Sequence, residues 1–357
     1  MEYSLESRRV LVTGASGFIG SKLCRSLRDQ GHEVFGTYNS PSRRCLLEEM
    51  GVKPIQLELA EFSNTAEADD SVNTPALPQV DVVFHLAGML SGPLNNLIQV
   101  NGEATRALAS HYAQQNVPPR FLYVSSVAAG GPSSSDAPRR ENDKPMPSSN
   151  YGRSKFAGEV SVAAFADRMR VTIVRPGIVF GEGDREFVQL INSLHKLRSC
   201  PVVGSGTQPL AFVEVNDLVN LLMVAAERGE TIPAEMAADP SFGEGRGIYY
   251  GVDSTPLSLV QVKDLYREAT HRFAFSVHLP TTFGWMMGAA AELGTKTLGL
   301  KTTLSRDKIR EAMAPGWWAS SQKANDQLNW RPKYPVDETM RRWIRQMCGS
   351  VPDIARV

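Results

Sequence analysis

The stretch RRVLVTGASGFIGSKLCRSLRDQGHEVFGTYN, residues 8–39, decides the fold. It opens with a β-branched apolar run, Val10 to Val12, and passes through a glycine-rich turn into apolar residues at helical spacing, namely Ile19, Leu23 and Leu27. Residues at this spacing lie on one face of a helix, and Gly31 stands where a C-cap glycine ends one. A second strand is predicted at EVFGTY, residues 33–38. The order strand, turn, helix, strand is the start of a βαβ unit.

The same alternation continues along the chain. Further apolar runs occur at KPIQLEL, VDVVFHLAG, RFLYVSS and RVTIVRPGIVFG, separated by helix-length segments such as 101–115 and 151–168. This order predicts an α/β fold, a Rossmann-type doubly wound parallel sheet, over residues 1–180. The alternation loosens near residue 180, so 181–357 is predicted to be a smaller, mixed domain that mainly binds substrate. Within it, a segment near 205–228 is expected to return to the Rossmann sheet.

Composition and charge exclude several function classes. The 357 residues are 42% hydrophobic and 21% charged, with 38 Lys plus Arg against 38 Asp plus Glu. A net charge of zero gives no field that would attract nucleic acid. The four cysteines lie far apart and the six histidines form no cluster, so no metal site is predicted. The most apolar stretch, FGWMMGAAAELG at 283–294, is too short to span a bilayer. A cytoplasmic protein without a membrane span is therefore expected.

The glycine turn predicts a dinucleotide site. Gly14, Gly17 and Gly20 give G-x-x-G-x-x-G directly after the first strand. Such a turn lets the backbone approach a pyrophosphate, whose oxygens are attracted by the free N–H groups at a helix N-terminus. The spacing has one more residue between the first two glycines than the general Rossmann fingerprint. The alternative is a turn that only lets strand and helix pack closely.

The end of the second strand bears on the choice of cofactor. A carboxylate there would bind the ribose hydroxyl of NAD and repel the extra phosphate of NADP. Tyr38 and Asn39 stand at this tip, and no acid follows until Glu48. Arg43 and Arg44 follow instead, and guanidinium groups pair well with phosphate. The sequence therefore favours NADP over NAD, unless both arginines project into solvent.

A Tyr and a Lys four residues apart, Tyr151 and Lys155, lie in SSNYGRSKFAGEV at 148–160. Residues at this spacing share one helix face. An ammonium group held near a phenol favours the phenolate, which would suit Tyr151 as a general acid or base near neutral pH. The alternative is an ordinary surface helix.

Several stretches together resemble one family, the extended short-chain dehydrogenase/reductases, which include NAD-dependent epimerase/dehydratases and 3β-hydroxysteroid dehydrogenase-like enzymes. The resemblance runs from about residue 8 to about residue 345. It rests on VTGASGFIG, HLAG at 85–88, VNG at 100–102, YVSS at 123–126, YGRSK at 151–155, RPGIVFGEGD at 175–184 and FVEVNDL at 212–218.

The resemblance implies roles for individual residues. Tyr151 would be the acid/base, Lys155 would lower its pKa and hold the nicotinamide ribose, and Ser126 would bind the substrate oxygen. Asn101 would support the proton relay or the local backbone. The residues expected to line the cofactor are Gly14, Gly17, Phe18, Ile19, Gly20, Asn39, Arg43, Arg44, Glu58, Leu59, Leu86, Ala87, Gly88, Tyr151, Lys155, Pro176, Gly177 and Ile178. His85, just before this loop, is expected to be satisfied locally. A homodimer is predicted on resemblance alone.

Two departures from the family narrow the substrate. Dehydratases usually carry an acid pair after the catalytic Ser or Thr, whereas Val127 and Ala128 follow Ser126 here. Sugar-nucleotide epimerases often have an Arg-Asp pair where this chain has Leu210 and Ala211. The main hypothesis is therefore an NAD(P)-dependent oxidoreductase acting on an alcohol or ketone of an apolar or moderately polar small molecule. The alternatives are a sugar-nucleotide epimerase with tightly held NAD and a non-catalytic dinucleotide sensor. Apolar residues of the second domain are expected to wall a pocket or to form ordinary core: Trp285, Met286, Met287, Trp317 and Trp318.

Overall fold

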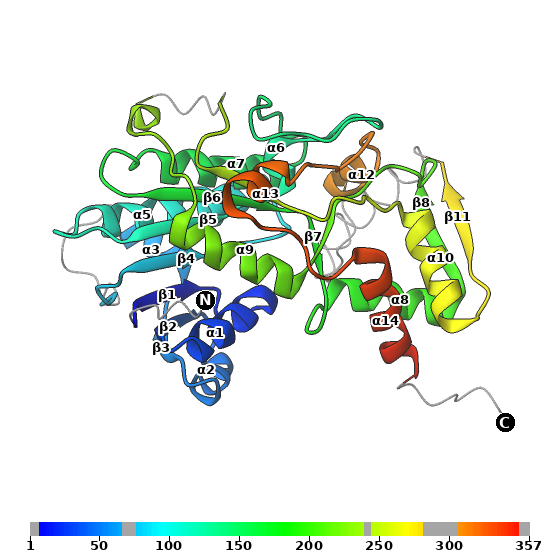
Figure 1. Ribbon diagram of the computed structural model, residues 1–357, viewed down its shortest axis with the longest axis horizontal. Coiled ribbons are helices and arrows are strands. Elements are labelled where there is room, and N and C mark those ends of the chain that lie inside the picture. Colours follow the sequence, from blue (N-terminus) through cyan, green and yellow to red (C-terminus); the bar gives the residue numbers. More distant parts are fainter. Residues whose placement is uncertain (1–6, 66–75, 239–243, 281–305, 350–357) are drawn as a thin grey trace.

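The computed structural model describes residues 7–65, 76–238, 244–280 and 306–349. Its centre is a parallel sheet of seven strands in the order β10-β6-β5-β4-β1-β2-β3 (Figure 1). The strands are β1 Arg9–Thr13, β2 Glu33–Tyr38, β3 Lys53–Gln56, β4 Val82–His85, β5 Arg120–Val124, β6 Val171–Pro176 and β10 Ile248–Gly251. The predicted Rossmann-type fold is confirmed.

Helices cover both faces of this sheet because its strands are apolar on both faces. Val10 and Val12 of β1 pack towards α1 (Phe18–Asp29) and α9 (Val215–Arg228), whereas Leu11 packs towards the opposite face. That opposite layer is formed by α3 Leu59–Thr65, α5 Ala104–Ala113 and α7 Asn150–Ala163. Each fully buried Leu or Val side chain contributes roughly 2 kcal/mol of hydrophobic stabilisation.

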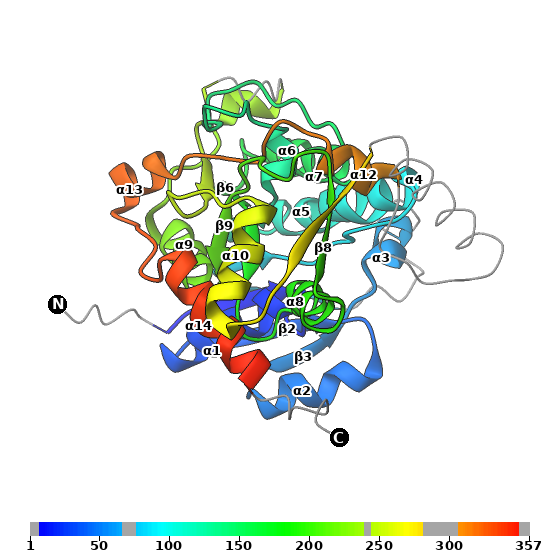
Figure 2. The same ribbon diagram turned by 90° about the vertical axis from the view of Figure 1, so that its right-hand side faces the viewer.

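A third core lies beyond the sheet. It is built from α8 Glu186–Leu197, α10 Leu259–Thr270 and α14 Val336–Gly349, with β8 Ser199–Val203 paired in parallel to β11 Phe275–Leu279. Figure 2 shows β8 and β11 side by side. Two short strands, β7 Ile178–Phe180 and β9 Phe212–Glu214, form another parallel pair between this part and the main sheet.

The segment near 205–228 was expected to return to the main sheet, and it does so through its helix and not through its strand. Its strand β9 pairs with β7, and only its helix α9 packs on the seven-stranded sheet. The strand that returns to the sheet is β10, which pairs with β6 in the register Ile248↔Ile173. Its four residues, IYYG, are all buried, so the open edge of β6 is covered by an apolar strand from later in the chain.

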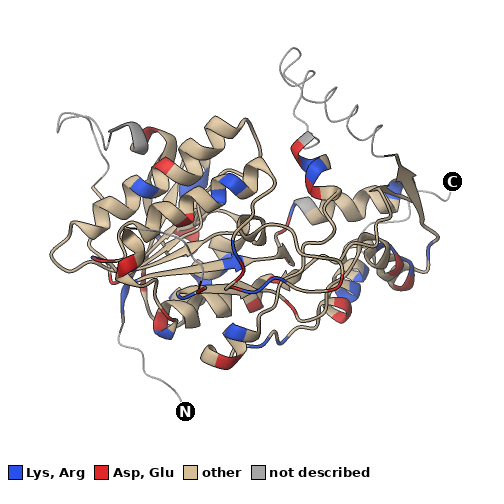
Figure 3. Ribbon diagram, turned by 90° about the horizontal axis from the view of Figure 1, so that it is seen from above, with Lys and Arg blue, Asp and Glu red and all other residues tan. Residues whose placement is uncertain are grey.

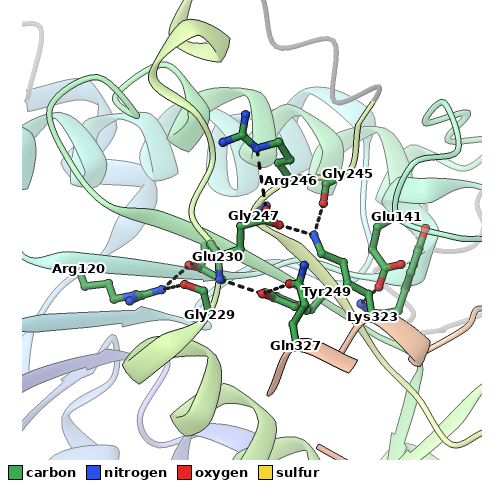
Figure 4. Close-up of polar contacts among 12 residues, drawn as sticks. Arg120, Glu141, Gly229, Glu230, Gly245, Arg246, Gly247, Tyr249, Lys323 and Gln327 are labelled. Carbon is green, nitrogen blue, oxygen red and sulfur yellow. Dashed lines mark hydrogen bonds and ion pairs between the residues drawn. The ribbon is translucent and has the colours of Figure 1, made fainter. Parts of the chain in front are cut away.

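The C-terminal segment is fastened to this edge by a polar network (Figure 4). Lys323 of α13 (Gln322–Leu328) forms an ion pair with Glu230 at 2.7 Å. The Tyr249 hydroxyl accepts from the Glu230 N–H at 2.8 Å and donates to Gln327 at 2.7 Å. Helix α13 therefore folds back over β10 and is tied to it by side-chain contacts.

The surface carries both signs of charge, and Figure 3 shows Lys and Arg interspersed with Asp and Glu. Within the described ranges, no helix is long and apolar enough to cross a membrane. The apolar stretch 283–294, with Trp285, Met286 and Met287, lies outside the described residues.

Candidate active site

The glycine turn lies at the carboxyl edge of the sheet, between β1 and α1. Gly14 has a φ of +67°, a conformation that side chains rarely adopt, and a Cβ on it would lie 3.0 Å from the Ala87 nitrogen. A Cβ on Gly20 would lie 2.1 Å from the Gly14 carbonyl oxygen. Only glycine therefore fits these two positions, and the backbone cradle that results suits a dinucleotide pyrophosphate at the start of α1.

A buried hydrogen-bond chain holds the loop next to this cradle. The Thr13 hydroxyl accepts from the N–H groups of Leu86 and Ala87, each at 3.1 Å. Its own proton is then directed to His85 Nδ1 at 2.7 Å, so His85 donates from Nε2 to the Thr105 hydroxyl at 2.9 Å. Burial lowers the pKa of His85 to about 3, so the ring is neutral. The interpretation of His85 as locally satisfied is confirmed.

A second loop approaches the start of α1. Gly183, in the GEGD loop at 181–184, lies beside the Phe18 ring, since a Cβ on it would be 3.3 Å from a Phe18 ring carbon. Lys22 of α1 pairs with Glu182 at 2.6 Å. Phe18 and Ile19 are half-buried at this place.

Tight packing brings the elements of Ser126 and Tyr151 together. Ser126 is the N-cap of the short helix α6 (Val127–Gly130), and its hydroxyl accepts from the Ala128 N–H at 3.2 Å. Gly152, next to Tyr151 in α7, lies so close to α6 that a Cβ would be 2.4 Å from the Ala128 carbonyl oxygen. The absence of a side chain at 152 therefore allows the first turn of α7 to contact the turn that carries Ser126.

Lys155 lies one helical turn after Tyr151 and is buried. Its ammonium group is 4.3 Å from the centre of the Tyr123 ring, and it approaches Gly88 in the loop that follows β4. Burial lowers the pKa of Lys155 to about 7, and the nearby Glu159 carboxylate opposes this shift. Glu159 in turn binds the fully buried Arg175 through two hydrogen bonds, of 2.8 and 2.6 Å. The Glu159 carboxylate, itself held by Arg175, therefore favours the charged form of Lys155.

Asn101 lies in a π-helical turn, Gln99–Glu103, between α4 (Leu94–Ile98) and α5. Its amide oxygen accepts from the Met89 N–H at 2.8 Å. Its amide nitrogen donates to the Met89 carbonyl at 2.8 Å and to the Ser154 hydroxyl at 2.9 Å. The side chain thus joins the loop after β4, at Met89, to Ser154 of α7. Of the two roles expected for Asn101, these contacts match support of the local backbone.

One polar residue of the site was missed by the sequence analysis. The Asp307 carboxylate accepts from the Asn150 N–H at 2.8 and 3.0 Å and from the Tyr151 N–H at 3.4 Å. Asp307 belongs to α12 (Arg306–Ala312), while Ser149 caps the next N–H of α7, on Gly152, at 3.0 Å. The first three N–H groups of α7 are thus satisfied, two of them by a distant carboxylate. No sequence signal links residues 157 positions apart.

The two arginines after β2 differ in their contacts. Arg44 forms an ion pair with Glu48, four residues later in the chain, at 2.8 Å. Arg43, in the 3₁₀ turn Pro41–Arg43, has no carboxylate within 4 Å among the described residues. Asn39 is exposed beside this turn. Of the two, Arg43 is the better placed to meet a ribose phosphate.

The remaining expected cofactor residues lie at carboxyl ends of strands. Glu58 is exposed just after β3, while Leu59 begins α3 and packs in the core. Pro176 ends β6, and a Cβ on Gly177 would lie 2.4 Å from the Ala211 carbonyl oxygen. Ile178 is 38% exposed, so it offers an apolar surface at this edge.

Leu210 and Ala211 stand where many epimerases have an Arg-Asp pair, and their backbone groups are hydrogen-bonded to other segments. Leu210 pairs with Leu257 and Trp317, and the N–H of the buried Ala211 donates to the Trp317 carbonyl at 2.7 Å. Trp317 directs its indole N–H to the Glu311 carbonyl at 2.8 Å. No cationic side chain stands at 210 or 211 to grip a diphosphate.

Several known proteins are similar to this chain in sequence. Two curated relatives are the uncharacterized protein y4nG of Sinorhizobium fredii (30% identical over 224 residues, 61% of this chain and 53% of that protein) and the ceramide reductase of Caulobacter vibrioides (32% over 214 residues, 58% and 57%). The chain thus spans little more than half the length of these two relatives. A third is the UDP-glucose 4-epimerase of Vibrio cholerae (28% over 232 residues, 62% and 67%).

Among solved structures, the UDP-glucuronic acid 4-epimerase of Bacillus cereus in complex with UDP-glucuronic acid and NAD is similar in fold. Its TM-score is 0.69 at 19% identity, covering 95% of this chain and 99% of that one. The family model for the NAD dependent epimerase/dehydratase family matches residues 10–237, more than half of the chain. The chain therefore belongs to the NAD dependent epimerase/dehydratase family, within the extended short-chain dehydrogenase/reductases, a class of NAD(P)-dependent dehydrogenases, reductases and epimerases.

Proposed function

We propose that this protein interconverts a secondary alcohol and a ketone on an apolar or moderately polar small molecule. The observation that carries the proposal is the first turn of α7. There Tyr151 lies one turn before the buried Lys155, and Gly152 packs against the helix that Ser126 caps. The glycine cradle and the loop held by Thr13 fit NAD(P), which would supply the hydride donor or acceptor.

The chain's own residues would handle the proton. Tyr151 takes the hydroxyl proton when an alcohol is oxidised, and returns it when a ketone is reduced. Ser126 hydrogen-bonds the same oxygen, so the charge that develops there has two partners. Lys155 in its charged form favours the phenolate of Tyr151 and is aimed at the cofactor loop beside Gly88. Asn101 and Asp307 fix the loop and the helix that carry these groups.

Two features narrow the substrate and the reaction. The positions that would grip a nucleotide diphosphate hold Leu210 and Ala211, whose backbone is paired with Trp317 and Leu257. The positions after Ser126 that would supply elimination chemistry hold Val127 and Ala128. A ceramide reductase among the curated relatives fits the proposed substrate class.

The second candidate is a sugar-nucleotide epimerase, in which the same groups oxidise and then reduce a sugar with retained NAD. It is favoured by the Vibrio cholerae UDP-glucose 4-epimerase among the relatives. A non-catalytic dinucleotide sensor is the third candidate. The intact set of Ser126, Tyr151 and Lys155 counts against it.

For the cofactor we favour NADP, because no carboxylate follows β2 and Arg43 is available to a phosphate. The pairing of Arg44 with Glu48 reduces this support to one arginine. We also propose a homodimer formed through α5 and α7.

The test is turnover of a panel of hydrophobic ketones with NADPH or NADH, beside UDP-glucose and UDP-glucuronic acid. Tyr151→Phe should lower kcat for any accepted substrate by about 10²-fold or more. Tyr334→Phe, at a residue 40% exposed in the C-terminal segment, is the matched control and should leave kcat unchanged. Equal rates for wild type and Tyr151→Phe would refute the mechanism, and turnover of the UDP-sugars alone would establish the epimerase.

A further inference from the structure

Large apolar side chains are exposed together at the far end of the C-terminal part. Leu197, Phe273, Phe275 and Val277 are 68%, 64%, 46% and 36% exposed. They lie where α8 and α10 end and where β8 and β11 begin (Figure 1). These four residues, named here the apolar tip, make up four of the ten large hydrophobic residues that are exposed in the described ranges.

The four residues form one surface. The Phe273 and Phe275 rings stack with centroids 6.2 Å apart, and the Phe275 N–H donates to the carbonyl of Arg198, which follows Leu197, at 3.0 Å. Val277 lies two residues after Phe275 and so shares its face of β11. In the parallel register, Val277 pairs with the exposed Pro201 of β8, which extends the surface.

The apolar tip is held rigidly to the core but is not part of it. Cys200 and Val202 alternate with Pro201 and point to the opposite face, where they are buried against α8 and α10. Both helices end in left-handed residues, Arg198 with a φ of 53° and His271 with a φ of 54°. The chain therefore turns away from the core immediately beside Leu197 and Phe273, leaving both side chains in solvent.

Cations lie beside two members of the apolar tip, Leu197 and Phe273. Lys196 and Arg198 flank Leu197 in sequence, both are exposed, and neither has a carboxylate within 4 Å among the described residues. The Arg267 guanidinium lies 5.7 Å from the centre of the Phe273 ring. The nearby acids are already paired: Asp264 with Lys263 and Arg267, and Glu268 with Arg341. Strand β11 itself carries no Lys, Arg, Asp or Glu.

We propose that the apolar tip docks on an anionic lipid surface. Exposed aromatic and aliphatic side chains enter the headgroup region, and Lys196 and Arg198 meet the lipid phosphates. A second copy of the chain fits less well, because an isologous contact would place the two basic rims against each other. The proposal concerns binding alone, so it stands or falls independently of the reaction proposed above.

The experiment is co-sedimentation of the full chain with vesicles of phosphatidylcholine, with and without phosphatidylglycerol. We expect binding to the anionic vesicles that weakens as salt is raised, and about tenfold weaker binding to the neutral ones. The double variant Phe273→Ser/Phe275→Ser should bind anionic vesicles about tenfold more weakly. Lys196→Gln/Arg198→Gln should lose the preference for phosphatidylglycerol.

The matched control is Val117→Ser, because Val117 is 69% exposed but lies outside the apolar tip. It should bind like wild type, and thermal unfolding checks that every variant is folded. Absence of wild-type binding, or equal binding by the double serine variant, would overturn the proposal. Sedimentation velocity tests whether a second copy of the chain binds the apolar tip instead. Self-association that depends on Phe273 and Phe275, without vesicle binding, would assign the surface to a second copy.

Discussion

At the scale of single residues, Arg43 and Arg44 after β2 differ in whether a neighbouring acid leaves the guanidinium group available to a phosphate. Both follow the strand whose tip lacks a carboxylate, but only Arg44 has an acid four residues later. Its ion pair with Glu48 occupies one of the two guanidinium groups that the sequence offers to a ribose phosphate. Surface pairs of this kind contribute little stability, yet they direct the side chain.

Substitution of Arg43 tests the cofactor. We expect calorimetry on the purified protein to give NADPH binding about tenfold tighter than NADH, and Arg43→Ala to remove this difference. Arg44→Ala is the control and should retain it. Tighter binding of NADH by wild type, or NAD that co-purifies with the protein, would contradict the NADP assignment and favour the epimerase.

His85 predicts an acid-sensitive stability. Its pKa is about 3 in the folded chain, against an ordinary value of 6.5, so below pH 6.5 the unfolded state binds the proton that the native state refuses. The stability that His85 supports is complete above pH 6.5 and is lost as the pH falls towards 3. Between pH 7 and pH 5 this loss is about 2 kcal/mol.

Urea unfolding at pH 7 and at pH 5 measures this loss. His85→Gln keeps a donor and an acceptor for Thr13 and Thr105 but should show a smaller decrease in the free energy of unfolding. His271→Asn, at an exposed position, should behave like wild type. If His85→Gln and wild type lose the same stability, the ring does not remain neutral in the folded chain.

At the scale of elements, α7 depends on α12. The carboxylate of Asp307 satisfies the first two N–H groups of α7 and places a negative charge at the positive end of its dipole. Since Tyr151 is the second residue of that helix, the docking of α12 fixes the backbone that carries the proposed acid/base.

Asp307→Asn should therefore lower kcat by about tenfold, with little change in KM, and reduce the free energy of unfolding by about 1 kcal/mol. Steady-state kinetics and urea unfolding measure the two effects. Asp136→Asn removes an exposed carboxylate from the neighbouring loop and should change neither. An unchanged kcat in Asp307→Asn would show that α12 does not position Tyr151.

Elements that depend on local sequence signals could be predicted, whereas elements that depend on tertiary packing could not. The glycine turn, the first helix and the Tyr151–Lys155 face were predicted because their signals lie within a few residues. The return of β10 rather than β9 to the sheet was not, because several apolar runs compete for the edge of β6 and tertiary packing selects one. Asp307 was missed because its contact with α7 also depends on tertiary packing. Asn101 was predicted from the resemblance, but its hydrogen bonds to Met89 and Ser154 could not be predicted from the sequence.

At the scale of the whole molecule, the half-buried face of α7 predicts the assembly. Phe156 and Val160 of this helix, and its C-cap residue Ala164, remain partly exposed. A dimer through α5 and α7 would bury them. Sedimentation equilibrium should give twice 39.1 kDa at micromolar concentration for wild type, and a monomer for Val160→Glu. Val277→Glu, at an exposed position of β11 and outside α5 and α7, is the control, and a monomeric wild type would disprove the dimer.

The capping of α7 by Asp307 also has a consequence for biosynthesis. A ribosome releases α7, which carries the proposed acid/base, long before it makes the residue that caps this helix, because 157 residues separate Asn150 from Asp307. During that interval the nascent chain can complete most of the nucleotide-binding sheet while the first turn of α7 still has two N–H groups open to water. On the proposed mechanism, the site becomes competent late in translation, and chains that terminate before α12 should bind dinucleotide better than they turn over substrate.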